Sequence, residues 1–207
     1  MRYSAYNDQI KKEIYDKYSL IAGIDEVGRG PLAGPVVTCA VIMKKNSNID
    51  GVTDSKKLKR HKMLELKEKI LEDTLAVSYG YANSKKIDEI NIRQATLLAM
   101  KMAVENLEIT PEILLIDAER IDSNIPQLNI VKGDLNEYAI SCASILAKVC
   151  RDDIMINFSK IYSGYSFETN VGYGTKKHYE AIDNYGITPI HRLSFLKKYC
   201  AKQESFL

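Results

Sequence analysis

The chain has 207 residues, a length that suits one large domain or a domain with a small appendage. With 45% hydrophobic and 27% charged residues the composition excludes a disordered chain, and a net charge of +2 excludes binding of a polyanion through overall charge alone. The sequence has no CxxC pair, no signal peptide and no apolar run near the ~20 residues that span a bilayer, so we expect a cytoplasmic protein without membrane contact or structural zinc.

Residues 1–18 carry Ile10, Ile14 and Tyr18 at helical spacing among many charges. This pattern predicts a short amphipathic helix lying on the main body. We assign no chemistry to this segment.

Residues 20–24 are apolar and predict a buried strand, which two acids, Asp25 and Glu26, follow directly. A carboxylate at the edge of a core is tolerated when it is paired, hydrogen-bonded or bound to a metal, and two neighbouring carboxylates repel each other. The pair therefore implies a cation nearby.

Gly28, Arg29 and Gly30 come next and place one guanidinium between two residues that have no side chain. The backbone of a partner could approach closely here while Arg29 binds a phosphate. Residues 34–43 predict a second strand, and the Gly and Pro residues before it predict a tight antiparallel connection.

A polar loop leads to Asp54 and Ser55, either of which could cap a following helix. Lys56 and Lys57 lie beside the expected helix N-terminus, which is a suitable seat for phosphate. A run of lysines is usually a solvated surface, but the nearby acids favour contact with a polyanion. Ser55, Lys56 and Lys57 are thus candidate substrate-binding residues.

Residues 74–82 predict a third strand and residues 84–107 one long buried helix, because apolar side chains recur along it at helical spacing. Residues 112–116 predict a short strand that ends in Asp117, and open α/β sheets place their sites at such strand ends. Alone, Asp117 would more often be a turn residue.

Residues 126–131 predict a further strand, followed by Asp134 and a long helix of small apolar residues. Asp134 and Glu137 have the spacing of a capping box, so Asp134 is either a helix cap or, beside the other acids, a metal ligand. Farther on, Tyr173 stands between two glycines that leave its ring open to a flat partner, although a lone Tyr is more often a turn aromatic.

Four carboxylates could therefore converge on one edge of a mixed sheet: Asp25, Glu26, Asp117 and Asp134. No thiolate pair or closely spaced histidine pair accompanies them, so the ligand set favours Mg²⁺ or Mn²⁺ over zinc. Two such ions would explain the number of acids, and a two-metal site carries out in-line displacement at phosphorus.

The string GIDEVGRGPLAGPVV resembles the opening signature of type 2 ribonuclease H, the ribonuclease HII family, as do the segments DSKKL and SCASILAKVCRD. The resemblance extends from about residue 20 to residue 195. It implies an α/β ribonuclease H-like fold, a five-stranded mixed sheet flanked by helices, with a small helical C-terminal appendage. We expect residues 1–19 to form an extension, 20–160 the catalytic domain and 161–207 the substrate-binding appendage.

The resemblance also implies roles for residues. The four acids match metal ligands of the family, while Gly28, Arg29, Gly30 and Tyr173 match the set that recognises a 2′-hydroxyl at an RNA-to-DNA junction. Asn91 resembles a position near the active cleft. The implied enzyme is a monomer that hydrolyses RNA–DNA hybrids and cuts 5′ to ribonucleotides in duplex DNA, leaving 3′-hydroxyl and 5′-phosphate ends.

Two departures from the family pattern are mild: Glu119 follows Asp117 where many relatives have glycine, and Ile187 replaces a common proline. Glu119 could add negative charge near the metals. The alternatives are a ribonuclease HIII-like hybrid nuclease, which usually carries a preceding substrate-binding domain, and a non-catalytic nucleic-acid-binding module. Metal dependence of cleavage would separate the last from the nucleases.

Overall fold

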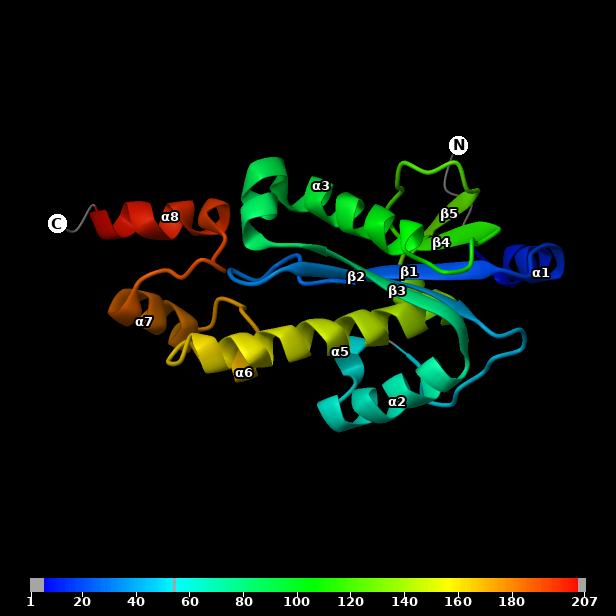
Figure 1. Ribbon diagram of the computed structural model, residues 1–207, viewed down its shortest axis with the longest axis horizontal. Coiled ribbons are helices and arrows are strands. Elements are labelled where there is room, and N and C mark those ends of the chain that lie inside the picture. Colours follow the sequence, from blue (N-terminus) through cyan, green and yellow to red (C-terminus); the bar gives the residue numbers. More distant parts are fainter. Residues whose placement is uncertain (1–5, 54, 205–207) are drawn as a thin grey trace.

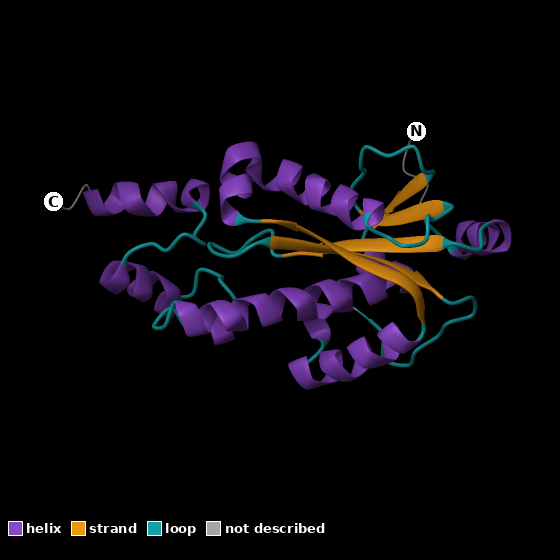
Figure 2. Cartoon of the chain, viewed as in Figure 1, coloured by secondary structure: helices purple, strands orange, loops and turns teal. Residues whose placement is uncertain are grey.

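A mixed five-stranded sheet forms the centre of the computed structural model, which describes residues 6–53 and 55–204 (Figures 1 and 2). Its order is β3-β2-β1-β4-β5. The strands are β1 (Ile21–Val27), β2 (Val36–Met43), β3 (Thr74–Ala82), β4 (Ile113–Asp117) and β5 (Gln127–Ile130). β1 pairs antiparallel with β2 and parallel with β4, so the predicted five-stranded mixed sheet is confirmed.

Helices cover both faces of the sheet, with α3 (Ser84–Glu105) on one and α2 (Arg60–Glu72) and α5 (Tyr138–Ile161) on the other (Figure 1). Met100 of α3 packs against Leu114, and Leu146 of α5 packs with Val41. α5 lies so close to β1 that a Cβ at Gly23 would collide with the backbone of α5. The small residues of α5 thus bring its N-terminal part directly onto the central strand.

The remaining elements are α1 (Asp8–Lys17), η1 (Ser55–Lys57), α4 (Gly133–Asn136), α6 (Phe167–Asn170), α7 (Lys176–Tyr185) and α8 (Leu193–Glu204). Of these, α1 lies near one end of the sheet and α6, α7 and α8 lie beyond the other (Figure 1). Phe167, Ile182 and Leu196 from the last three helices share a core with Leu32 and Met155. The proposed division at residues 19 and 160 stays a prediction. Among the described helices none has the length and apolar character needed to cross a membrane.

The first strand is longer than predicted, because β1 continues to Val27 and contains the two acids instead of ending before them. The long partner strand β2 keeps the ladder going, with Asp25 opposite Cys39 and Glu26 opposite Thr38. Successive side chains of a strand point to opposite faces. Asp25 and Glu26 therefore leave the sheet on different sides.

The helix predicted as one piece is kinked at Asn91, whose backbone is non-helical at φ 65° and ψ 163°. Its side-chain oxygen accepts a hydrogen bond from the Gln94 N–H at 3.1 Å and so caps the second part of α3. The first part turns toward the C-terminal segment, where the Ser84 hydroxyl donates to the Pro189 carbonyl at 3.0 Å. The kink therefore lets the first part of α3 contact the C-terminal segment while the second part packs on the sheet.

Candidate active site

The four predicted acids come from three elements that meet at one edge of the sheet. Because β1 and β4 are parallel and Ile24 lies beside Ile116, the next residues, Asp25 and Asp117, are neighbours at the carboxyl ends of both strands. Asp134 follows β5 in the short helix α4 and lies close enough to Asp117 to affect its ionisation. Sequence-distant acids thus form one cluster.

Asp134 does not cap the long helix, contrary to the capping-box interpretation. Glu137 is the N-cap of α5 and accepts a hydrogen bond from the Ala139 N–H. The buried Glu137 carboxylate also accepts the hydroxyls of Tyr6 and Tyr15, which ties the N-terminal helix α1 to α5. Since Glu137 is the N-cap of α5, the Asp134 side chain does not cap that helix. It lies in the preceding helix α4, beside the other acids.

The acidic cluster places carboxyl groups close together where burial disfavours their charged forms. Burial, together with the carboxylates of Glu26 and Asp117, raises the pKa of Asp25 well above its usual value. Burial also raises the pKa of Glu26 and of Asp117, although Arg29 opposes the shift at Glu26. A divalent cation would restore the charged forms, because an opposite charge favours the ionised carboxylate.

Side-chain cations contact the acids. The Lys56 ammonium lies 3.0 Å from Asp134, and the Arg29 guanidinium lies 3.4 Å from Glu26 and 3.3 Å from Glu119. With these pairs in place, no three acids, histidines or cysteines in residues 6–53 and 55–204 are close enough together to hold an ion. The Lys56 and Arg29 side chains are partly exposed, so they can swing aside at little cost.

One buried carboxylate oxygen offers a ligand for a divalent cation. Oε2 of Glu26 is buried and has no hydrogen-bond partner among the described residues. An unpaired buried carboxylate oxygen is costly, and a hard divalent cation would satisfy it. The all-oxygen donor set therefore fits Mg²⁺ or Mn²⁺.

Several supporting groups were not predicted from the sequence. The Ser144 hydroxyl hydrogen-bonds with Asp25, and Ser55 Oγ lies 3.0 Å from Ser144 Oγ. The Gly133 N–H donates to Asp117 at 2.7 Å. The structure thus places Ser55, a predicted substrate-binding residue, in a buried position behind Asp25. The support that Ser55 gives to Asp25 through Ser144 is visible only in the folded structure, since no sequence motif links Ser55 to α5.

The Gly-Arg-Gly loop and Tyr173 lie together, although they are far apart in the sequence. A Cβ at Gly30 would lie 3.5 Å from Cε1 of Tyr173, and the Tyr173 side chain is exposed. Arg29 connects this pair to the acids through Glu26. The loop, the ring and the carboxylates therefore form one continuous surface.

The other predicted site residues are dispersed. Lys57 is exposed at the end of η1, and Asn91 is exposed at the kink of α3. Two residues beyond the kink, Arg93 lies 3.5 Å from Glu119, so Glu119 joins α3 to the acidic cluster as well as adding charge to it. Asp54 lies outside the described residues. The substrate contacts of Lys57 and Asn91 stay predictions.

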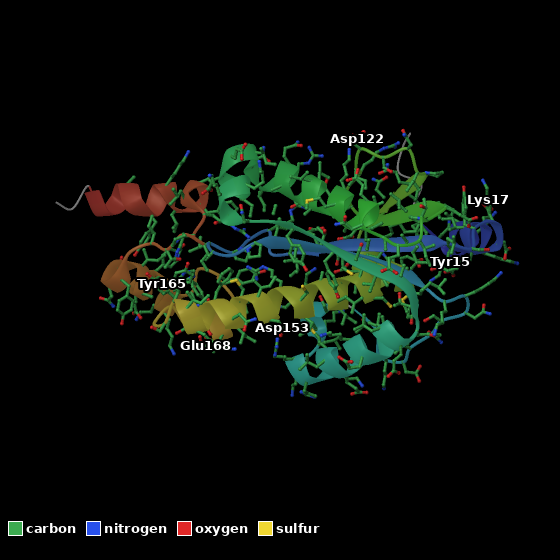
Figure 3. All side chains as sticks on the ribbon, in the orientation of Figure 1. Tyr15, Lys17, Asp122, Asp153, Tyr165 and Glu168 are labelled. Carbon is green, nitrogen blue, oxygen red and sulfur yellow. The ribbon has the colours of Figure 1, made fainter. Side chains whose placement is uncertain are left out.

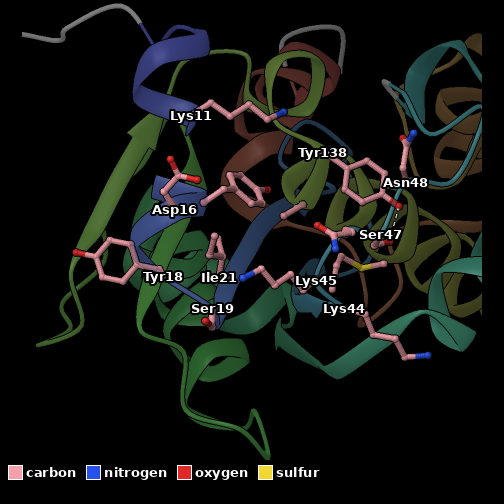
Figure 4. A pocket seen from close by; sticks show the side chains of 14 residues that line it. Lys11, Asp16, Tyr18, Ser19, Ile21, Lys44, Lys45, Ser47, Asn48 and Tyr138 are labelled. Atoms are coloured by element: carbon pink, nitrogen blue, oxygen red, sulfur yellow. Dashed lines mark hydrogen bonds between the residues drawn. The ribbon is translucent and has the colours of Figure 1, made fainter. Parts of the chain in front are cut away.

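A separate cavity of about 480 Å³ opens between α1, the loop after β2 and the start of α5 (Figure 4). Lys11, Tyr138 and Ser47 face it, and none of the predicted site residues lines it. The carboxylates are the better candidate for the active site, because the unpaired buried oxygen of Glu26 lies among them and not in the cavity.

Comparison with known proteins identifies the family of the chain. A sequence model of the family Ribonuclease HII matches residues 22–198. The ribonuclease HII of Ligilactobacillus salivarius is 53% identical over 188 residues, which cover 90% of this chain and 74% of that protein. That of Clostridioides difficile is 54% identical over 189 residues, with the same shares covered.

The fold is also similar to that of a solved structure, the ribonuclease H2 from Pyrococcus horikoshii OT3. The TM-score is 0.72 at 25% sequence identity, over 86% of this chain and 95% of that chain. Both the sequence match over most of the chain and the shared fold lead to one conclusion: this protein is an endonuclease of the ribonuclease HII family.

Proposed function

We propose that the protein hydrolyses the RNA strand of RNA–DNA hybrids and cuts 5′ to ribonucleotides embedded in duplex DNA, leaving 3′-hydroxyl and 5′-phosphate ends. The observation that carries this proposal is the position of the buried carboxylates near Gly30 and the exposed ring of Tyr173. A cation site and a surface that fits one sugar adjoin each other there. We further propose that the enzyme acts as a cytoplasmic monomer.

In this proposal Asp25, Glu26, Asp117 and Asp134 hold two Mg²⁺ or Mn²⁺ ions. Bound ions would lower the pKa of an attacking water and stabilise the leaving oxygen at phosphorus. The carboxylates fix the position of the ions, and the hydrogen bonds from Ser144 and Gly133 orient Asp25 and Asp117. The chain itself then needs no nucleophile.

Discrimination of RNA from DNA is assigned to the loop and the ring. A protein tells the two apart at one nucleotide through the 2′-hydroxyl. We assign the binding of that hydroxyl to backbone groups around Gly28 and Gly30, the packing of the sugar to Tyr173 and a phosphate contact to Arg29. Arg29 suits the last role because it is partly exposed and already lies at the acidic cluster.

A cleavage assay tests the proposal. Duplexes with one ribonucleotide, four ribonucleotides or a complete RNA strand are incubated with the enzyme, and the product ends are identified. EDTA is expected to abolish cleavage of all three, and added Mg²⁺ or Mn²⁺ to restore it. Cleavage that persists in EDTA, or of a duplex made only of DNA, would contradict the proposed function.

The lysines of η1 are expected to contribute to duplex binding. Changing Lys56 and Lys57 to Ala removes two exposed ammonium groups of η1, of which Lys56 lies next to Asp134, so affinity should fall equally for hybrid and DNA duplexes. The slope of log K against log salt should become less negative by about 0.9 for each phosphate that the variant no longer neutralises. Binding titrations at several salt concentrations measure it. An unchanged slope would assign both lysines to a solvated surface.

A further inference from the structure

Arg192 is fully buried and forms hydrogen bonds to the backbone of the Gly-Arg-Gly loop from the protein interior. Its guanidinium donates to the carbonyl of Gly28 at 2.6 Å and to that of Arg29 at 2.9 Å. It also donates to the Gly34 carbonyl at 3.0 Å. One side chain from the C-terminal segment thus holds three carbonyls of the loop between β1 and β2.

These bonds determine where the loop amides point. In a trans peptide the C=O and the following N–H lie on opposite sides, and the structure contains no cis peptide bond among the residues it describes. With the carbonyls of Gly28 and Arg29 turned inward to Arg192, the N–H groups of Arg29 and Gly30 face outward. Neither N–H donates to a backbone group in the part of the chain that the structure describes. Two donors therefore face the side on which the substrate is proposed to bind.

A second buried arginine holds the other side of the loop. Arg151 of α5 donates to the carbonyl of Pro35 at 2.9 Å and to that of Ala33 at 3.2 Å. Its third bond, at 2.9 Å, reaches the carbonyl of Val171, two residues before Tyr173. Arg151 therefore joins the loop to the segment that carries the ring.

The two guanidiniums are charged groups in an apolar setting. Burial lowers the pKa of Arg151 to about 10 and that of Arg192 to about 9, so both remain protonated at neutral pH. Within the described residues neither forms an ion pair with a carboxylate, although Asp152 favours the charged form of Arg151 and Asp88 that of Arg192. Burying two cations without a carboxylate partner costs free energy. Packing of the C-terminal segment would not by itself require charged side chains at these two positions.

The backbone of Tyr173 is held in a similar way by two buried histidines. His178 Nδ1–H donates to the Tyr173 carbonyl at 2.9 Å, and the Nε2 atoms of His178 and His191 are 3.0 Å apart. Since the Thr188 N–H donates to Nδ1 of His191, the proton of His191 lies on Nε2 and points at His178. This chain is consistent only when both rings are neutral.

We propose that Arg192, with Arg151, is a positioning residue for 2′-hydroxyl recognition: it orients the amides of Arg29 and Gly30 toward the sugar and fixes them relative to Tyr173. This inference rests on the proposed function. It assigns discrimination between RNA and DNA to a buried contact between the C-terminal segment and the loop.

The test measures binding and cleavage in the full-length protein. Arg192→Lys keeps the charge but loses the planar fork that reaches three carbonyls, and Arg151→Lys does the same on the other side. In EDTA, each variant is expected to bind a DNA duplex as the wild type does, yet to lose most of its preference for a duplex with one ribonucleotide. With metal, cleavage of that duplex should fall roughly 10- to 100-fold in kcat.

Two comparisons separate positioning from general stability. Ile182→Ala removes a buried apolar side chain of α7 and leaves every hydrogen bond to the loop in place, so it should lower the melting temperature and keep the ribonucleotide preference. In a Tyr173→Ala background, Arg192→Lys should add little further loss, because both changes affect recognition of the same sugar.

Three results would overturn the inference: an unchanged preference in both arginine variants, losses that multiply fully with Tyr173→Ala, or failure of both variants to fold at low temperature. The last would assign the arginines to folding alone. If the proposed function itself is wrong, the wild type will show no preference for the ribonucleotide. The two failures are therefore distinguishable.

Discussion

Replacing Asp25 by Asn is expected to abolish cleavage while leaving the protein folded. Changing a residue that hydrogen-bonds to a metal ligand typically lowers activity or metal affinity about 10- to 100-fold. Replacing a ligand itself should therefore lower the cleavage rate more than about 100-fold. In EDTA the melting temperature should stay equal or rise, because burial and the neighbouring carboxylates already disfavour the charged form of Asp25. Single-turnover cleavage and thermal unfolding measure both effects.

A matched control is Asp122→Asn, the same chemical change on the loop between β4 and β5 (Figure 3). The Asp122 side chain is 94% exposed and pairs with Lys101, away from the acidic cluster. This variant should cleave at the wild-type rate. Asp134→Asn should lose activity like Asp25→Asn. Substantial activity of Asp25→Asn would remove that residue from the proposed metal ligands.

Tyr173→Ala is expected to lower cleavage at a single embedded ribonucleotide by roughly ten- to a hundredfold, the effect of removing an interaction of ~1 to 3 kcal/mol. The ring lies near Gly30, and its removal would open the surface that is proposed to receive the sugar. Metal affinity should persist, because no carboxylate changes. Cleavage kinetics, metal titration and circular dichroism together measure these expectations.

Tyr185→Ala is the control for this second variant. Tyr185 lies at the end of α7 in the same C-terminal segment and is 66% exposed, and its ring packs on Tyr165. Figure 3 shows Tyr165 in that segment. The control should keep its activity. If Tyr173→Ala also cuts at the wild-type rate, Tyr173 is only a turn aromatic.

Local patterns in the sequence predicted most of the architecture. Apolar runs and one alternating segment located all five strands, because such patterns depend on a few neighbouring residues. The signature around Asp25 identified the family, which the sequence comparisons confirm. The ends of elements were less predictable: β1 continues past its acids only because β2 offers hydrogen-bond partners along its whole length.

The sequence by itself determined the family and the residues that are proposed to carry the chemistry, namely the four acids, the Gly-Arg-Gly loop and Tyr173. Tertiary structure alone decided how they are held, since these contacts join residues far apart in the chain. Arg192 and Gly28, for example, are 164 positions apart, yet a hydrogen bond joins them. Likewise, Glu137 caps α5 and accepts the hydroxyls of Tyr6 and Tyr15, which are 131 and 122 positions away. A buried polar group takes whichever partner the packed core brings within reach, and no local sequence pattern specifies that partner.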